Sequence, residues 1–156
     1  MKRHFLLAAF SLIATAHAVE ITLSDKFVMI SNESVRLAYD MNAGTYSAKD
    51  IRSGIITFAN ARFTVDEVGW KQKEPPTRTW LSADVADAFG KGKRLTIVEK
   101  PGGKYLPIKS LHITLYDNIP YAVLGFSVTN HRELPARICR VGILDKAKLF
   151  PGKAIE

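Results

Sequence analysis

Alternation between apolar and polar residues dominates the chain after its first eighteen positions. Residues 34–39 place an apolar side chain at every second position. Residues 110–116 do the same, with Leu111, Ile113 and Leu115 on one face and polar or aromatic residues on the other. A period of two is typical of strands that bury one face and leave the other toward solvent. The pattern therefore predicts half-buried β-strands.

Short turn motifs rich in glycine, proline and aspartate separate these strands. Only residues 82–89 have the composition of a helical turn, and no longer segment after the first eighteen residues has helical periodicity. Many short strands with regular turns between them predict an all-β fold, specifically an antiparallel β-sandwich. The turn motifs lie at residues 40–44, 50–54, 73–76, 101–103 and 117–120.

The stretch DAFGKGKRLTI, residues 87–97, alternates glycine with lysine and could be taken for a phosphate-binding loop. Such a loop has the pattern Gly-x-x-x-x-Gly-Lys-Ser/Thr between a strand and a helix. Here Gly90 and Gly92 are only two positions apart, and Arg94 occupies the place of the hydroxyl residue. A strand-like run follows instead of a helix. We interpret the stretch as a tight connection into a strand, in which glycine adopts positive φ at little cost.

The first residues have the parts of a secretory signal peptide: a basic start, an apolar run over residues 5–16 and an Ala-His-Ala ending at Ala18. A membrane-spanning helix needs about 20 apolar residues, so we expect no stable membrane anchor. We predict a signal peptide over residues 1–18 and a single β-sandwich domain over residues 19–156. The domain is expected to be exported to the periplasm or the extracellular space.

Charge and side-chain chemistry exclude several classes of function. The formal net charge of +7 falls to +5 without Lys2 and Arg3, and the remaining basic residues are scattered, so we expect no nucleic-acid partner. The single Cys139 lies in a strand-like segment and is expected to be a small buried residue. His112 and His131 are expected to be exposed. Two histidines without cysteine partners favour neither a metal site nor a cofactor.

Several segments together resemble a known arrangement. Residues 30–46 carry Asn, Val, Leu and Tyr-Asp on a strand that turns through Asn-Ala-Gly into Thr-Tyr. Residues 84–87, 90–97, 111–120 and 126–130 follow in order. This order resembles the N-terminal β-sandwich of α-galactosidase (melibiase) and raffinose-synthase-like glycoside hydrolases, and it covers nearly all of the chain after the signal peptide.

The resemblance implies a galactose-mutarotase-like sandwich, which in that family precedes a (β/α)₈ barrel carrying the catalytic carboxylates. The chain reaches Glu156 before such a barrel could begin. A fragment, one part of a split gene and a free-standing module all stay open. We expect a non-catalytic, carbohydrate-associated sandwich that supports or completes an α-galactosidase-like glycoside hydrolase. The alternative is a stand-alone exported carbohydrate-binding or scaffolding module.

The expected binding residues are Trp80, Asp84 and Asp87. A tryptophan face can cover the C–H face of a sugar while carboxylates accept its hydroxyl groups, although Trp80 could equally be a core residue. Asp40 and Asp117 sit at turns, where aspartate bonds to the local backbone. We therefore predict no catalytic residue in this chain. The expected partners are a carbohydrate and either a catalytic barrel or a second copy of the chain.

Overall fold

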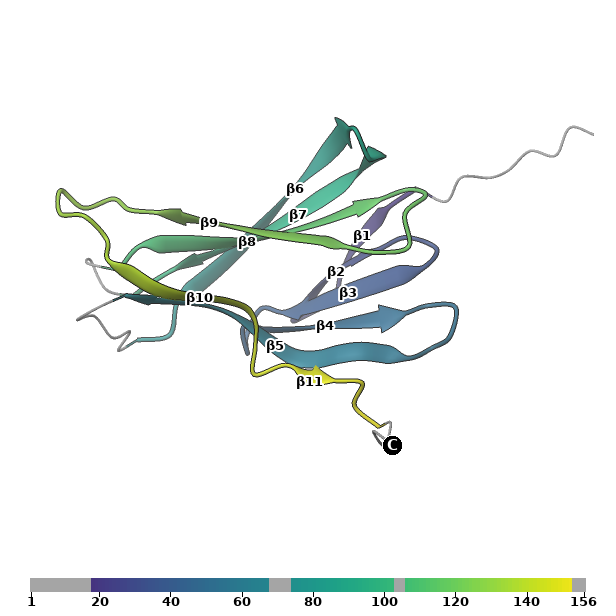
Figure 1. Cartoon of the computed structure of the whole chain (residues 1–156), viewed down its shortest axis with the longest axis horizontal. Coiled ribbons are helices and arrows are strands. Elements are labelled where there is room, and N and C mark those ends of the chain that lie inside the picture. Colours follow the sequence, from purple (N-terminus) through teal and green to yellow (C-terminus); the bar gives the residue numbers. More distant parts are fainter. Residues whose placement is uncertain (1–17, 68–73, 103–105, 153–156) are drawn as a thin grey trace, which may run out of the picture.

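The computed structural model describes residues 18–67, 74–102 and 106–152, and these form two antiparallel β-sheets without any helix (Figure 1). The all-β, sandwich-like prediction is therefore confirmed. In the described residues there is also no helix long and apolar enough to cross a membrane. The strands are β1 (Glu20–Leu23), β2 (Phe27–Ser31), β3 (Val35–Asp40), β4 (Thr45–Asp50), β5 (Ile56–Glu67), β6 (Thr77–Asp87), β7 (Gly90–Lys100), β8 (Ile108–Tyr116), β9 (Val123–Thr129), β10 (Ile138–Asp145) and β11 (Lys148–Leu149).

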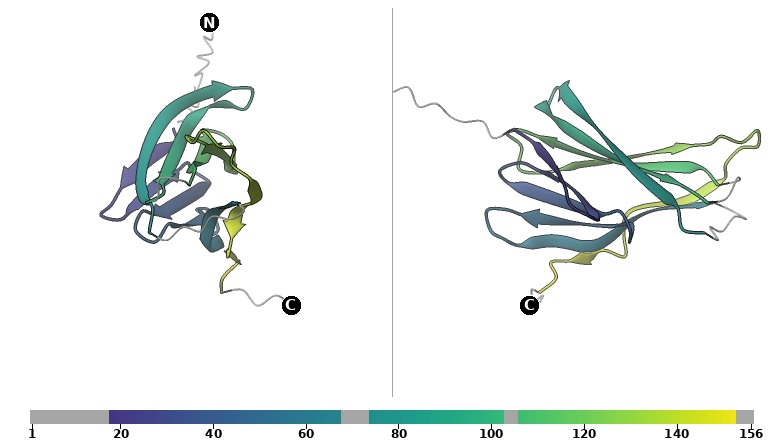
Figure 2. Two further views of the ribbon diagram at one scale, coloured as in Figure 1. Left: turned by 90° about the vertical axis from the view of Figure 1, so that its left-hand side faces the viewer. Right: turned by 180° about the vertical axis from the view of Figure 1, so that it is seen from behind.

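The two sheets differ in size. The larger one has the order β1-β2-β3-β4-β5-β10, with β11 also pairing with β5, and the smaller one has the order β6-β7-β8-β9. Within each sheet most neighbours are also neighbours in sequence, because short turns join antiparallel strands. The chain changes sheet after β5 and returns after β9, so that β10 pairs with β5. Figure 2 shows the two layers from the side and from behind.

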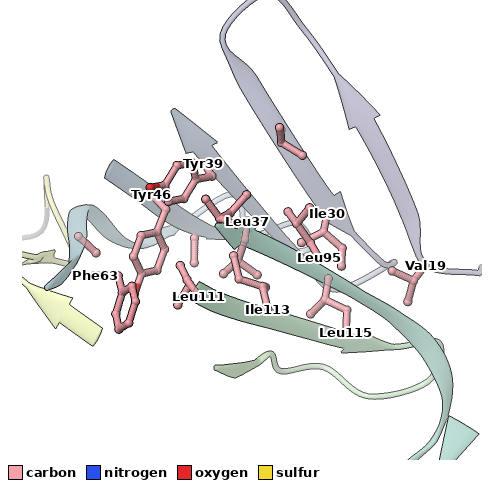
Figure 3. Packing of buried hydrophobic residues seen from close by; sticks show 14 residues of the cluster. Val19, Ile30, Leu37, Tyr39, Tyr46, Phe63, Leu95, Leu111, Ile113 and Leu115 are labelled. Atoms are coloured by element: carbon pink, nitrogen blue, oxygen red, sulfur yellow. The ribbon is translucent and has the colours of Figure 1, made fainter. Parts of the chain in front are cut away.

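The core lies between the layers and follows the predicted alternation. Leu111, Ile113 and Leu115 of β8 are all at most 1% exposed. They face Leu37 and Tyr39 of β3, as the close view in Figure 3 shows. Each fully buried large apolar side chain stabilises the fold by roughly 1.5–3 kcal/mol. The period-two pattern is thus the direct cause of the layered packing.

The glycine- and lysine-rich stretch belongs to a hairpin, but its turn is formed by Ala88 and Phe89, and residues 90–93, expected to be the connection, already lie in β7. Strands β6 and β7 pair in continuous register from Thr77–Lys100 to Asp87–Gly90. Gly90 has φ of +116°, a conformation that other residues rarely adopt. Gly92 is needed for a different reason, since a Cβ there would lie 2.1 Å from the Leu115 carbonyl oxygen of β8.

Asn32, in the β2–β3 turn, links the two sheets at one end of the sandwich. Its Nδ2 donates to the carbonyl oxygens of Tyr116 at 2.9 Å and Ile119 at 2.8 Å, which belong to the end of β8 and the turn that follows it. Its Oδ1 accepts from the backbone N–H groups of Ser34 and Val35. One buried amide therefore holds its own turn and clamps it to the other layer.

Residues 82–89, whose composition would suit a helical turn, are extended through Asp87 because they pair along β7. Two local expectations are wrong. Cys139 lies on a strand but is exposed. His112 is half-buried, because its ring nitrogens each lie 3.0 Å from a hydroxyl oxygen on a neighbouring strand, one of Thr96 and one of Ser127.

Candidate functional site

A polar pocket of about 650 Å³ opens at the end of the sandwich where β5 and β7 end and β6 and β8 begin. We call it the interlayer pocket, because its walls come from both sheets. Its apolar lining includes Phe63 and the prolines Pro75, Pro76, Pro101 and Pro107. Among the described residues, the charged side chains in its wall are Arg62, Asp66, Glu67, Glu74, Arg78, Glu99 and Lys109.

Strand register brings three of these charges into one row across the smaller sheet. Arg78 of β6 pairs with Glu99 of β7, and Glu99 pairs with Lys109 of β8. Each is two residues from an inward-facing side chain of the same strand, such as Ile97 or Leu111, so the row faces the same way as the core. The apolar stripe of the sandwich therefore ends in a charged row.

Glu99 is the centre of a buried network. Its Oε1 accepts from Arg78 Nε at 2.8 Å and from the Tyr39 hydroxyl at 2.7 Å, and its Oε2 lies 2.9 Å from Lys109 Nζ. The Glu99 side chain is only 5% exposed. Because Tyr39 belongs to the larger sheet, the network also joins the two layers.

The network fixes the protonation of its members. Burial opposes ionisation of Glu99, but the charge of Lys109 and the hydrogen bond from Arg78 outweigh it, so the pKa of Glu99 lies below its ordinary value. Burial, with the charge of Glu99, raises the pKa of Tyr39. Burial also acts against the charge of Arg78, yet the bond and charge of Glu99 leave its pKa raised. Glu99 therefore stays a carboxylate and Tyr39 stays a donor.

Glu67 supplies a second buried carboxylate, at the end of β5. Its Oε1 accepts from Arg132 Nη2 and from the backbone N–H of Arg137. Its Oε2 is buried and has no hydrogen-bond partner among the described residues, and the same is true of Thr64 Oγ1. Buried polar atoms nearly always have a partner, so these two atoms beside the pocket require an explanation.

The composition of the wall favours a neutral polar ligand. Three basic and four acidic residues line the pocket, and Arg132 beside Glu67 brings the two signs into balance. An anion such as phosphate would meet the carboxylates, and a cation would meet the arginines and Lys109. A polyhydroxylated ligand uses donors and acceptors together, and its C–H groups pack on apolar surface.

The residues predicted from the sequence lie elsewhere and apart from one another. Trp80 is half-buried and packs against the core. Asp84 is exposed and accepts from Lys93 Nζ at 2.6 Å. Asp87 accepts from the Tyr116 hydroxyl at 2.7 Å. Trp80 and Asp84 share a face of β6, whereas Asp87 is an odd number of positions away and lies on the other.

Sequence reasoning missed the residues that form the pocket. Glu99 and Lys109 lie two positions from Ile97 and Leu111, on the same strand faces as these apolar residues. A charged residue on a face that is otherwise apolar could have indicated the site from the sequence. Glu67 likewise lies an even number of positions after the buried Phe63, on the same face of β5. No group of three or more histidine, cysteine, aspartate or glutamate side chains that could hold a metal ion occurs in the described segments.

Comparison of the chain with family models, with curated proteins and with solved structures gives no match.

Proposed function

We propose that this chain is a non-catalytic carbohydrate-binding sandwich of the galactose-mutarotase-like type that serves an α-galactosidase-like glycoside hydrolase. The observation that carries the proposal is the interlayer pocket, with its balanced charges and the buried Oε2 of Glu67, which no described residue bonds. The sequence resemblance supports the choice of family, and the composition of the pocket supports the kind of ligand.

A sugar could make hydrogen bonds to the pocket's remaining donor and acceptor atoms. A hydroxyl group donating to Glu67 Oε2 would supply the missing partner of a buried carboxylate. Among the described residues, Lys109 Nζ donates to Glu99 and, at 3.3 Å, to the Phe63 carbonyl oxygen, which leaves its third proton for a ligand oxygen. The proline faces suit the C–H side of a pyranose ring.

The same contacts argue for binding without catalysis. Glycoside hydrolysis needs a carboxylic acid with a raised pKa beside a second carboxylate. The pKa of Glu99 is lowered, and its two oxygens are occupied by Arg78, Lys109 and Tyr39. In this proposal the reacting carboxylates belong to the hydrolase, and this sandwich holds part of its substrate.

Sugar affinity tests the assignment of the pocket. Titration calorimetry of the mature chain with galactose and an aryl α-galactoside is expected to detect binding. Glu67→Gln should weaken it about tenfold or more, because a carboxylate acceptor becomes an amide.

Asp84→Asn, outside the pocket, serves as the matched control and should leave the affinity unchanged. Circular dichroism must show that both variants keep the β-sheet spectrum. Loss of binding in Asp84→Asn but not in Glu67→Gln would move the site to the β6–β7 hairpin. Absence of any binding to either sugar would refute a carbohydrate site.

The open side of the sandwich suits the supporting role. Strand β9 ends the smaller sheet, and an apolar groove of about 350 Å³ runs between it and the larger sheet. Leu124 of β9 and Phe58 of β5 line this β9 groove, and Tyr121 at its rim is 51% exposed. An edge strand beside an apolar groove accepts an extended segment by β-augmentation. We infer that the catalytic domain of the hydrolase covers it.

Without the hydrolase, the mature chain is expected to self-associate as its concentration rises, because the β9 groove stays uncovered. Tyr121→Lys should shift the chain toward monomer in sedimentation velocity. Leu81→Lys is the matched control, since Leu81 is similarly exposed at 53% but lies outside the groove. A wild-type chain that stays monomeric at every concentration would contradict the docking role and favour the stand-alone module.

A further inference from the structure

The main-chain nitrogen of Val19 occupies an unusual place. The sequence predicts cleavage of the leader immediately before this residue, after Ala18. In the structure Ala18 is exposed, whereas Val19 is 2% exposed and belongs to the core. Figure 3 shows Val19 beyond Leu115 at one end of the row of buried side chains. The expected cleavage point and the beginning of the core therefore coincide.

The Val19 nitrogen donates to Asp117 Oδ1 at 3.0 Å. Asp117 lies in the β8–β9 turn, which Asn32 also holds through the Ile119 carbonyl oxygen. A hollow of about 350 Å³ adjoins this contact, lined by Ala18, Val19 and Asp117 and by part of the β6–β7 hairpin. The start of the domain is thus bonded to a carboxylate 98 positions away, beside free space.

We propose that removal of the leader after Ala18 creates a Val19 α-ammonium group that forms an ion pair with Asp117 and locks the start of the domain into the β8–β9 turn. A protease of the signal peptidase class hydrolyses the peptide bond. Water supplies the hydroxyl group to the Ala18 carboxyl and one proton to the Val19 nitrogen; the new carboxyl group then ionises, and the amine takes up a second proton to become an ammonium group. An α-amino group ordinarily has a pKa of about 7.7–8.0, so it is mostly protonated at neutral pH.

The same two atoms interact more strongly after cleavage. Before cleavage the bond joins a neutral amide to a carboxylate, and afterwards both partners are charged. Two opposite charges at hydrogen-bond distance attract each other more strongly, and partial burial limits screening by salt. The mature domain is therefore expected to be more stable than its precursor. This inference concerns processing and is independent of any carbohydrate site.

Three other charged residues line the same hollow. Asp84 and Lys93 line the hollow and are bonded to each other, and Lys91 lines it as well. Asp117 is thus the carboxylate that receives the Val19 nitrogen, and Asp84 is its natural comparison.

Urea unfolding of matched chains tests the proposal. One chain begins at Val19 with a free amine, and the other begins at an acetylated Ala18, so that Val19 keeps an amide. Asp117→Asn is expected to raise the unfolding equilibrium constant about tenfold or more in the first chain and about threefold or less in the second. Asp84→Asn should change both chains equally. N-terminal sequencing of the exported protein should find Val19 first. An equal effect of Asp117→Asn in both chains, or a different first residue, would overturn the proposal.

Discussion

Replacing Glu99 with glutamine is expected to lower the free energy of unfolding by about 3–5 kcal/mol, the largest effect of any polar substitution proposed for this chain. The substitution removes the negative charge from a side chain that is 5% exposed and leaves Arg78 and Lys109 together without their counterion. It also weakens the acceptor of the Tyr39 hydroxyl, which bridges the sheets. Urea unfolding followed by circular dichroism measures the change.

Glu33→Gln is the matched control, because it removes an ion pair of the same kind from the surface. Glu33 accepts from Arg52, and their side chains are 45% and 65% exposed. Exposed ion pairs contribute little to stability, so the control should unfold close to the wild type. Similar losses in both variants would show that burial does not set the strength of the Glu99 network.

The difference in unfolding free energy between wild type and Glu99→Gln should depend on pH. The pKa of Glu99 in the folded state lies below its ordinary value of 4.5. Its contribution is therefore fully present above the ordinary value and is lost as the pH falls through the lowered pKa. Wild type and Glu99→Gln should differ most near neutral pH and converge in acid. A difference that is constant down to the lowest pH would contradict this assignment.

Asn32→Asp is expected to cost about 3 kcal/mol of unfolding free energy, because the carbonyl oxygens of Tyr116 and Ile119 lose the amide donor that reaches them from the other sheet. The carboxylate can still accept from Ser34 and Val35, so the β2–β3 turn keeps its local bonds. The loss thus reports the contact between the sheets. Thermal unfolding at neutral pH measures it.

Asn118→Asp provides the comparison for this substitution. Asn118 lies in the β8–β9 turn that Asn32 clamps, but it is exposed. The same change of amide to carboxylate should there have only a small effect. If the two variants lose equal stability, the bonds from Asn32 to the other sheet do not hold the layers together.

The candidate site was harder to predict than the fold, and the residues show why. The sequence favours Trp80, Asp84 and Asp87 because they are close together in the chain and belong to types that bind sugars. In the structure Asp84 and Asp87 have separate partners, Lys93 and Tyr116. Whether they bind a sugar stays a prediction. The interlayer pocket instead gathers side chains from β5, β6, β7 and β8, and its composition follows from pairing that no single segment encodes.

The sequence alone determined the features that depend on neighbouring residues. Period-two alternation defined the strands and the inward face of β8, since successive side chains point to opposite sides. Glycine at position 90 indicated a turn, because positive φ is a property of one residue. Only the tertiary structure decided which strands pair and what covers each face. The packing leaves Cys139 exposed and His112 half-buried. It also joins Glu99 to Tyr39 across the layers, 60 positions apart in the chain. The physical reason is that burial and ion pairing depend on neighbours in space, which packing of the two sheets creates.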